Sequence, residues 1–136
     1  WGQIKDITGR LKDRSLLLNA ASVVKRSEVL AHQNFLADSL SSLNTLTANA
    51  ATNGLLEYAR DQENNPTLDL VSEYNTMRTQ LIALQDWVVA NFPKDASNNL
   101  AVYLFDVNKR YEDVDLTAGQ LSAFKTQLTN LTSTIA

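Results

Sequence analysis

Hydrophobic residues recur every three or four positions along most of this chain, which is the spacing of one face of an α-helix. The first such stripe lies within residues 3–18 and contains Ile4, Ile7, Leu11 and Leu18. The second ends at Phe92, before Pro93, and contains Leu70, Tyr74, Met77, Leu81, Leu84, Val88 and Phe92. The third follows residue 117 and contains Leu121, Phe124, Leu128, Leu131 and Ile135. These patterns predict three amphipathic helices.

The longest predicted helix covers residues 21–60, which contain no proline. Its apolar seam has the alternating spacing of three and four that defines heptad geometry. The seam consists of Val29, Gln33, Leu36, Leu40, Leu43, Thr47, Ala50 and Gly54. A helix of this length would extend about 60 Å. Its continuity with the first helix stays open, because the residues between them include no strong helix breaker.

Residues 98–111 fit two kinds of element. Leu100, Tyr103, Leu104, Val107 and Tyr111 have helical spacing, whereas the short AVYLF run is rich in residues that favour strands. We favour a helix here. The final helix is better defined, because Thr117 and Gln120 match a capping box, in which each residue satisfies a backbone N–H of the other. The loop DQENNP ends in Pro66, which marks the start of the helix that ends at Phe92.

Together these elements predict an all-α fold, a bundle of four to five helices, mainly antiparallel, with one long helix. The 136 residues fit a single domain, residues 1–136. With a net charge of −3, the chain has no general basic field to attract nucleic acid, so we expect no direct nucleic-acid partner. The absence of cysteine excludes disulfides and thiol chemistry.

Residues 39–56, SLSSLNTLTANAATNGLL, carry no charge in a chain that is 20% charged. Nine of these eighteen residues are Ser, Thr or Asn, so the run is too polar for a membrane span, and we expect no membrane partner. On the helix that we predict, its outer face is polar but nearly uncharged. We take Asn34, Ser41, Thr45, Asn49 and Thr52 as partner-interface candidates.

Two interpretations of this face stay open. It is either an ordinary solvated surface or a surface that another chain covers, since charged groups are costly to desolvate and are depleted at interface centres. The last segment has the same character, with one charge in the seventeen residues from Gln120. Trp87 and Phe105 lie off the apolar stripes of their segments, so either a neighbouring segment or a partner covers them.

The sequence offers little catalytic chemistry. Its one histidine, His32, has Glu28 one helical turn before it, but two ligands do not make a metal site. No nucleotide-binding glycine loop or nucleophile elbow is present. We therefore predict no enzyme activity, no cofactor and no metal. We expect His32 to be solvated or packed, and His32→Ala to change stability little.

The stretch RYEDVDLTAGQLSAFKTQLTNL, together with the long Asn-, Ser-, Thr- and Ala-rich helix before it, resembles small structural proteins encoded by tailed bacteriophages. The resemblance implies a virion component, present in many copies and held by contacts with other copies or other virion proteins. It would reside in the virion and, during assembly, in the host cytoplasm. The alternative is a cytoplasmic helical-bundle binding module for a small ligand or a partner helix.

Overall fold

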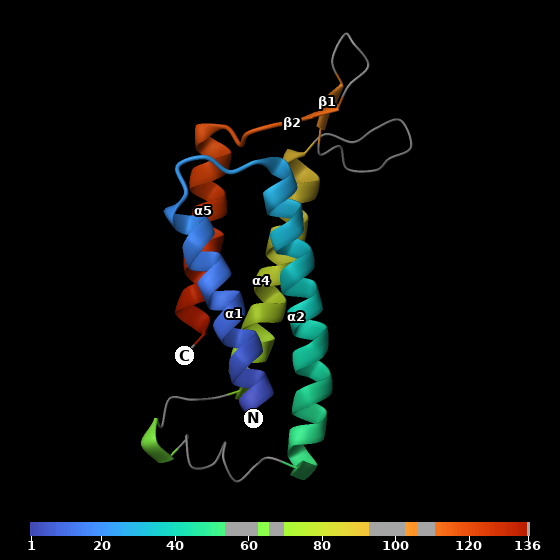
Figure 1. Cartoon of the computed structure of the whole chain (residues 1–136), viewed down its shortest axis with the longest axis vertical. Coiled ribbons are helices and arrows are strands. Elements are labelled where there is room, and N and C mark those ends of the chain that lie inside the picture. Colours follow the sequence, from blue (N-terminus) through green and yellow to red (C-terminus); the bar gives the residue numbers. More distant parts are fainter. Residues whose placement is uncertain (54–62, 66–69, 93–102, 106–110, 136) are drawn as a thin grey trace.

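The computed structural model describes residues 1–53, 63–65, 70–92, 103–105 and 111–135 (Figure 1). Within these residues, four long helices pack side by side, which confirms the all-α bundle. The helices are α1 (Gly2–Ala20), α2 (Arg26–Asn53), α4 (Leu70–Asn91) and α5 (Ala118–Thr134), and two short strands are β1 (Tyr103–Phe105) and β2 (Tyr111–Asp113). In the described part of the chain, no helix has both the length and the apolar character needed to span a membrane.

The chain runs in alternating directions through the four helices (Figure 1). Helix α1 packs against both α2 and α5, and α4 also packs against both of them. Two sets of side-chain hydrogen bonds fix the directions of α4 and α5. The Gln80 amide donates to the Asn130 carbonyl and to the Thr134 hydroxyl, whereas Gln120, near the start of α5, donates to the carbonyl of Asn91 at the end of α4.

The core consists of two groups of buried side chains, one toward each end of the bundle. The aliphatic cluster comprises Ile4, Leu11, Leu36, Leu40, Leu43, Leu70, Met77, Leu131 and Ile135. The aromatic cluster comprises Leu18, Val24, Val29, Leu84, Val88, Phe92, Leu116, Phe124 and Leu128, with Trp87 against it. The predicted stripes supply nearly all of these residues, because positions three or four apart share one face of a helix.

The connection between α1 and α2 is extended, so the two helices are separate. Arg26 donates its backbone N–H to the carbonyl of Val114, and Leu116 donates to the carbonyl of Val24. Lys25 and Asp115 face each other across this pairing, and their side chains form an ion pair of 3.2 Å. The predicted helix start at residue 21 is therefore wrong. The β-branched Val24 is buried in the connection, and the helix begins at Arg26, five residues after the predicted start. Residues 54–60 of the predicted helix lie outside the described part.

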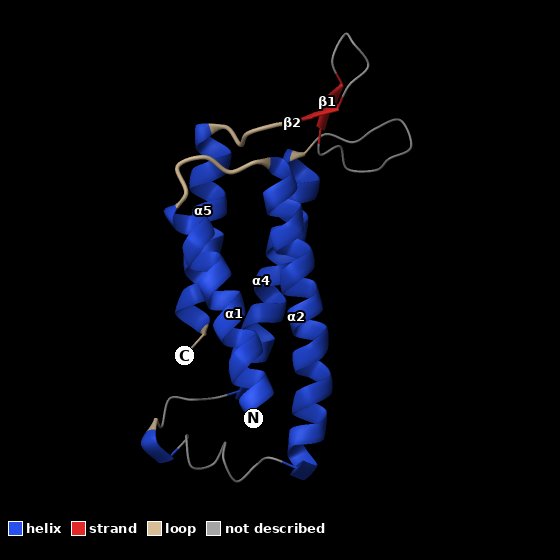
Figure 2. Ribbon diagram, viewed as in Figure 1, coloured by secondary structure: helices blue, strands red, loops and turns tan. Residues whose placement is uncertain are grey.

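The helix predicted over residues 98–111 is also wrong wherever the structure describes it. Residues 103–105 form β1, which pairs antiparallel with β2 beyond the end of the bundle (Figure 2). A run this short fits both the helical and the strand pattern. Backbone pairing with residues 111–113 decides that Tyr-Leu-Phe, whose residues favour strands, forms a strand. Thr117 and Gln120, by contrast, form both hydrogen bonds of the predicted capping box.

Candidate interaction surfaces

The outer face of α2 is exposed where its side chains are described. Asn34, Ser41 and Thr45 are all exposed, as is the charged residue Asp38 between them. The Thr45 hydroxyl donates to the Ser41 carbonyl at 3.3 Å, one turn earlier in the same helix. The side chains of Asn49 and Thr52 lie outside the described part of the structure.

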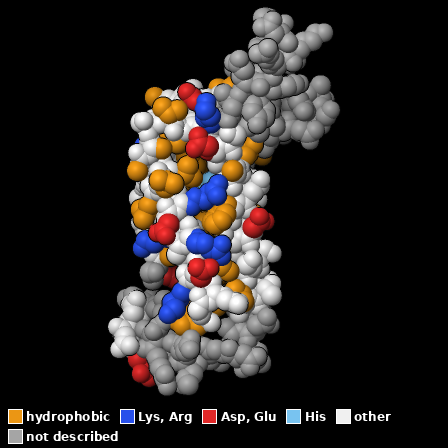
Figure 3. All heavy atoms as spheres, in the orientation of Figure 1, with side chains coloured by type: hydrophobic (Ala, Val, Ile, Leu, Met, Phe, Trp, Pro, Cys, Tyr) orange, Lys and Arg blue, Asp and Glu red, His pale blue; other side chains and the backbone are white. Residues whose placement is uncertain are grey.

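A groove runs along one edge of this face, between α1 and α2. Its α2 wall is formed by Ser41, Ser42, Thr45 and Leu46, and its α1 wall by Gln3, Asp6, Ile7 and Arg10. Asp6 and Arg10 form an exposed ion pair of 3.1 Å. In the space-filling view, the charged side chains gather in a band along the middle of this face of the bundle, and the flank over α2 is mostly uncharged (Figure 3). The α2 surface, on which Asp38 is the one charge described, is therefore bordered by the charges of Asp6 and Arg10 from α1.

Sequence reasoning missed the contribution of α1 to this groove. Asp6 and Arg10 are recognisable as an ion pair from their spacing, but they lie more than thirty residues from Ser41 in the chain. Only the packing of α1 against α2 brings the two walls together.

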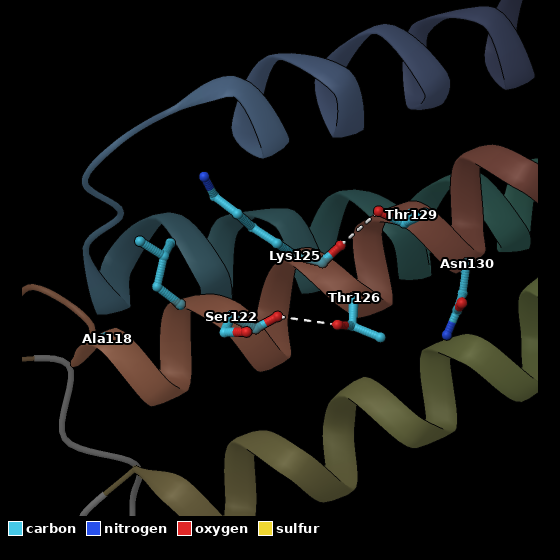
Figure 4. Close-up of a pocket in the computed structure, with 7 residues that line it drawn as sticks. Ala118, Ser122, Lys125, Thr126, Thr129 and Asn130 are labelled. Carbon is cyan, nitrogen blue, oxygen red and sulfur yellow. Dashed lines mark hydrogen bonds between the residues drawn. The ribbon is translucent and has the colours of Figure 1, made fainter.

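The outer surface of α5 is the second charge-poor surface. A shallow groove there is lined by Ala118, Leu121, Ser122, Lys125, Thr126, Thr129 and Asn130 (Figure 4). The Thr126 hydroxyl donates to the Ser122 carbonyl at 3.1 Å, and Thr129 donates to the Lys125 carbonyl at 3.0 Å. Thr129 also accepts a hydrogen bond from the Asn19 amide of α1. The Thr126 and Thr129 hydroxyls thus donate their hydrogens to carbonyls of α5 itself.

Trp87 packs mainly within the molecule. Its ring stacks on Phe124 of α5 at 6.2 Å and meets Phe92 edge-on at 5.8 Å. A neighbouring helix therefore covers part of the ring, and Trp87 stays partly exposed, so a partner contact at its exposed part stays a prediction. Phe105 lies in β1 opposite Tyr111, and its side chain is outside the described part.

His32 is packed in the core and is only 1% exposed. Its ring meets Phe124 edge-on at 5.9 Å. Burial, together with the positive charge of Arg14, lowers the pKa of His32 from 6.5 to about 4, so the ring is neutral at pH 7. A neutral, buried ring cannot reach a substrate, and its burial argues against the small stability effect expected for His32→Ala.

Glu28, which lies one helical turn before His32, forms a hydrogen bond at the start of α2. Its carboxylate accepts a hydrogen bond from the Lys25 backbone N–H at 3.1 Å. Among the described residues, no three His, Cys, Asp or Glu side chains come together as a metal site would require.

The chain matches no known protein family, and no match is found among curated proteins or solved structures. The inferences below therefore depend on the chain's own sequence and geometry.

Proposed function

We propose that this protein is a structural or assembly protein that acts through helical protein–protein interfaces, as a component of a bacteriophage particle. The observation that carries the proposal is the outer face of α2, where Ser41 and Thr45 are exposed beside a groove and Asp38 is the one charged residue of the described face. The charge-poor surface of α5 provides a second contact area.

The physical argument rests on the cost of desolvation. A solvated helix face commonly carries Lys and Glu, which keep proteins soluble and apart. Burying a lone Lys or Glu costs several kcal/mol, whereas hydroxyl and amide groups are tolerated where they find hydrogen bonds. A face of Ser, Thr and Asn therefore suits a surface that another chain covers.

The resemblance of residues 110–131 to phage structural proteins supplies the biological setting. In that setting the partners are other copies of the chain or other virion proteins, and the protein resides in the virion. The proposal requires no cofactor, nucleic acid or membrane.

The test places single charges on the α2 face. Ser41→Lys and Thr45→Glu each put an additional charge into the proposed contact, so both variants should fold but lose assembly. On an open helix surface each substitution would change the free energy of unfolding by no more than about 0.5 kcal/mol. Native mass from sedimentation velocity reports assembly, and circular dichroism reports helicity.

Ala31 provides the matched control. It is exposed on the same helix, before the uncharged face begins, and Glu28 precedes it by three residues. Ala31→Lys and Ala31→Glu add the same charges and should assemble as the wild type does. Normal assembly of the Ser41 and Thr45 variants, with wild-type helicity, would falsify the proposal.

The second candidate function is a binding module. The groove between α1 and α2 favours it, because Ile7 and Leu46 give a partner helix apolar contacts within polar walls. A protein that stays monomeric under all conditions, and whose melting temperature rises on addition of a helical peptide, would support this function instead.

A further inference from the structure

The outer face of α4 carries apolar side chains that stay half exposed in the folded chain. Ile82 is 50% exposed and Val89, two turns later, is 52% exposed. Both point away from the buried stripe of the same helix. The residues that share this outer face are all exposed: Asn75, Arg78, Thr79, Ile82, Gln85, Asp86 and Val89.

The charges on this face are arranged symmetrically about Ile82. Arg78 lies four residues before Ile82 and Asp86 lies four residues after it. Each charge is therefore displaced by about 6 Å along the helix axis, in opposite directions. Neither residue forms an ion pair with another described residue.

This order of charges is complementary to itself. If a second α4 lies antiparallel across the first, with a two-fold axis at Ile82, then Arg78 faces Asp86 of the second copy and Asp86 faces its Arg78. The two Ile82 side chains meet at the axis, and Val89 faces Asn75 of the second copy. A parallel pairing in register would instead bring Arg78 against Arg78 and Asp86 against Asp86.

We propose that the outer face of α4 binds the same face of a second copy of this chain, as a two-fold antiparallel helix pair centred on Ile82. The Ile82 pair lies at the centre, with the Arg78–Asp86 pairs on either side of it and the Val89–Asn75 contacts beyond them. Two-fold contacts require a self-complementary surface, and the Arg78–Ile82–Asp86 order supplies one. A foreign partner would need the same order of groups on its own helix, whereas a second copy always presents it.

This contact goes beyond the proposed assembly through α2, because it uses a different helix and a different kind of surface. One helix face is small compared with the interfaces of stable dimers, so we expect a weak dimer that forms with rising protein concentration. It would link copies in pairs, whatever α2 and α5 contact.

The test reverses the charges one at a time in the full chain and then mixes the variants. Arg78→Asp alone should weaken the dimer at least tenfold, because the introduced aspartate then faces Asp86 of the other copy twice across the axis. Asp86→Arg alone should do the same with two pairs of arginines. In a one-to-one mixture, each variant complements the other, and the heterodimer should form within about threefold of the wild-type dissociation constant.

Sedimentation equilibrium over a range of concentrations gives the dissociation constants, and Asp13→Arg on α1 is the control for an exposed charge reversal elsewhere. The measurements are repeated with Ser41→Lys present in every chain, so that contacts through α2 do not contribute. A wild-type chain that stays monomeric at every concentration overturns the proposal. It is also overturned by a dimer that neither reversal weakens, or by weakened variants that do not recover on mixing.

Discussion

The two core clusters of the bundle differ in chemistry although the same four helices build both. The buried residues of the aliphatic cluster are Leu and Ile with one Met, and its aromatic neighbours Trp1, Phe35 and Tyr74 are only partly buried. The aromatic cluster instead buries Phe92 and Phe124 in its interior, with Trp87 partly buried against them. His32 touches the aromatic cluster through Phe124, and Arg26 lies over Phe92 at 5.5 Å. The comparison shows that aromatic rings lie inside the core at one end of the bundle. At the other end they lie at the edge of the core, where Lys5 lies over Trp1 and Arg14 lies over Phe35.

The largest expected difference concerns Phe124, which is fully buried and contacts both His32 and Trp87. Phe124→Ala should lower the free energy of unfolding by about 3–5 kcal/mol, since it removes a large buried ring and its aromatic contacts. Chemical denaturation gives the value. Leu11→Ala, which is equally buried in the aliphatic cluster, should cost about 2–5 kcal/mol and serves as the comparison. A Phe124→Ala loss below that of Leu11→Ala would contradict the importance of the ring contacts.

The next effect is a pH dependence confined to the aromatic end. The pKa of His32 is about 4 in the folded chain and 6.5 when unfolded, so the unfolded state binds more protons between these values. Above pH 6.5 the ring is neutral in both states, and His32 does not reduce the free energy of unfolding. As the pH falls from 6.5 toward 4, protonation of the unfolded state lowers the free energy of unfolding by up to roughly 3 kcal/mol. His32→Leu removes this group, so the difference between wild type and variant should change over that pH window.

Hydrogen exchange locates the same effect within the bundle. Amides near His32 in the aromatic half should lose protection on acidification before amides around Leu11 do. Equal loss in both halves would mean that the two clusters open as one unit. A wild-type stability curve parallel to that of His32→Leu would contradict the assigned titration.

The smallest effect concerns the helix cap that leads into the aromatic cluster. Thr117→Ala removes the hydroxyl that accepts from the Gln120 N–H at 3.2 Å, and should cost about 1 kcal/mol. Thr117→Ser keeps the hydroxyl and should restore most of the loss, as thermal unfolding can measure. A cost near zero for the alanine variant would show that the start of α5 is held by its packing alone.

Much of the interior could be predicted from the sequence, since the stripes of α1, α4 and α5 follow directly from helical periodicity. Ile4, Met77 and Phe124 are examples of predicted stripe residues that are buried. The capping box at Thr117 was also predictable, because its geometry is local. In α2, the expected seam residue Gln33 is only partly buried, whereas the neighbouring His32 is buried. From the sequence alone, His32 could have been either solvated or packed.

The errors arose where distant segments decide local structure. Residues 21–25 contain no glycine or proline, yet the helix does not include them, and residues 24–26 pair instead with residues 114–116. The β1 pairing and the groove between α1 and α2 likewise depend on contacts that no local pattern encodes. The candidate surfaces were predictable as uncharged faces, but their borders, such as Asp6 and Arg10, were not.

The pairing of residues 24–26 with residues 114–116 also has a kinetic consequence. It joins positions ninety residues apart, so closing it carries a large loop entropy compared with helix formation or with packing α1 on α2. During synthesis, α1 and α2 are complete well before residues 114–116 exist. We therefore expect the pair α1–α2 to form early and the Lys25–Asp115 bridge to close late, as one of the last steps of folding.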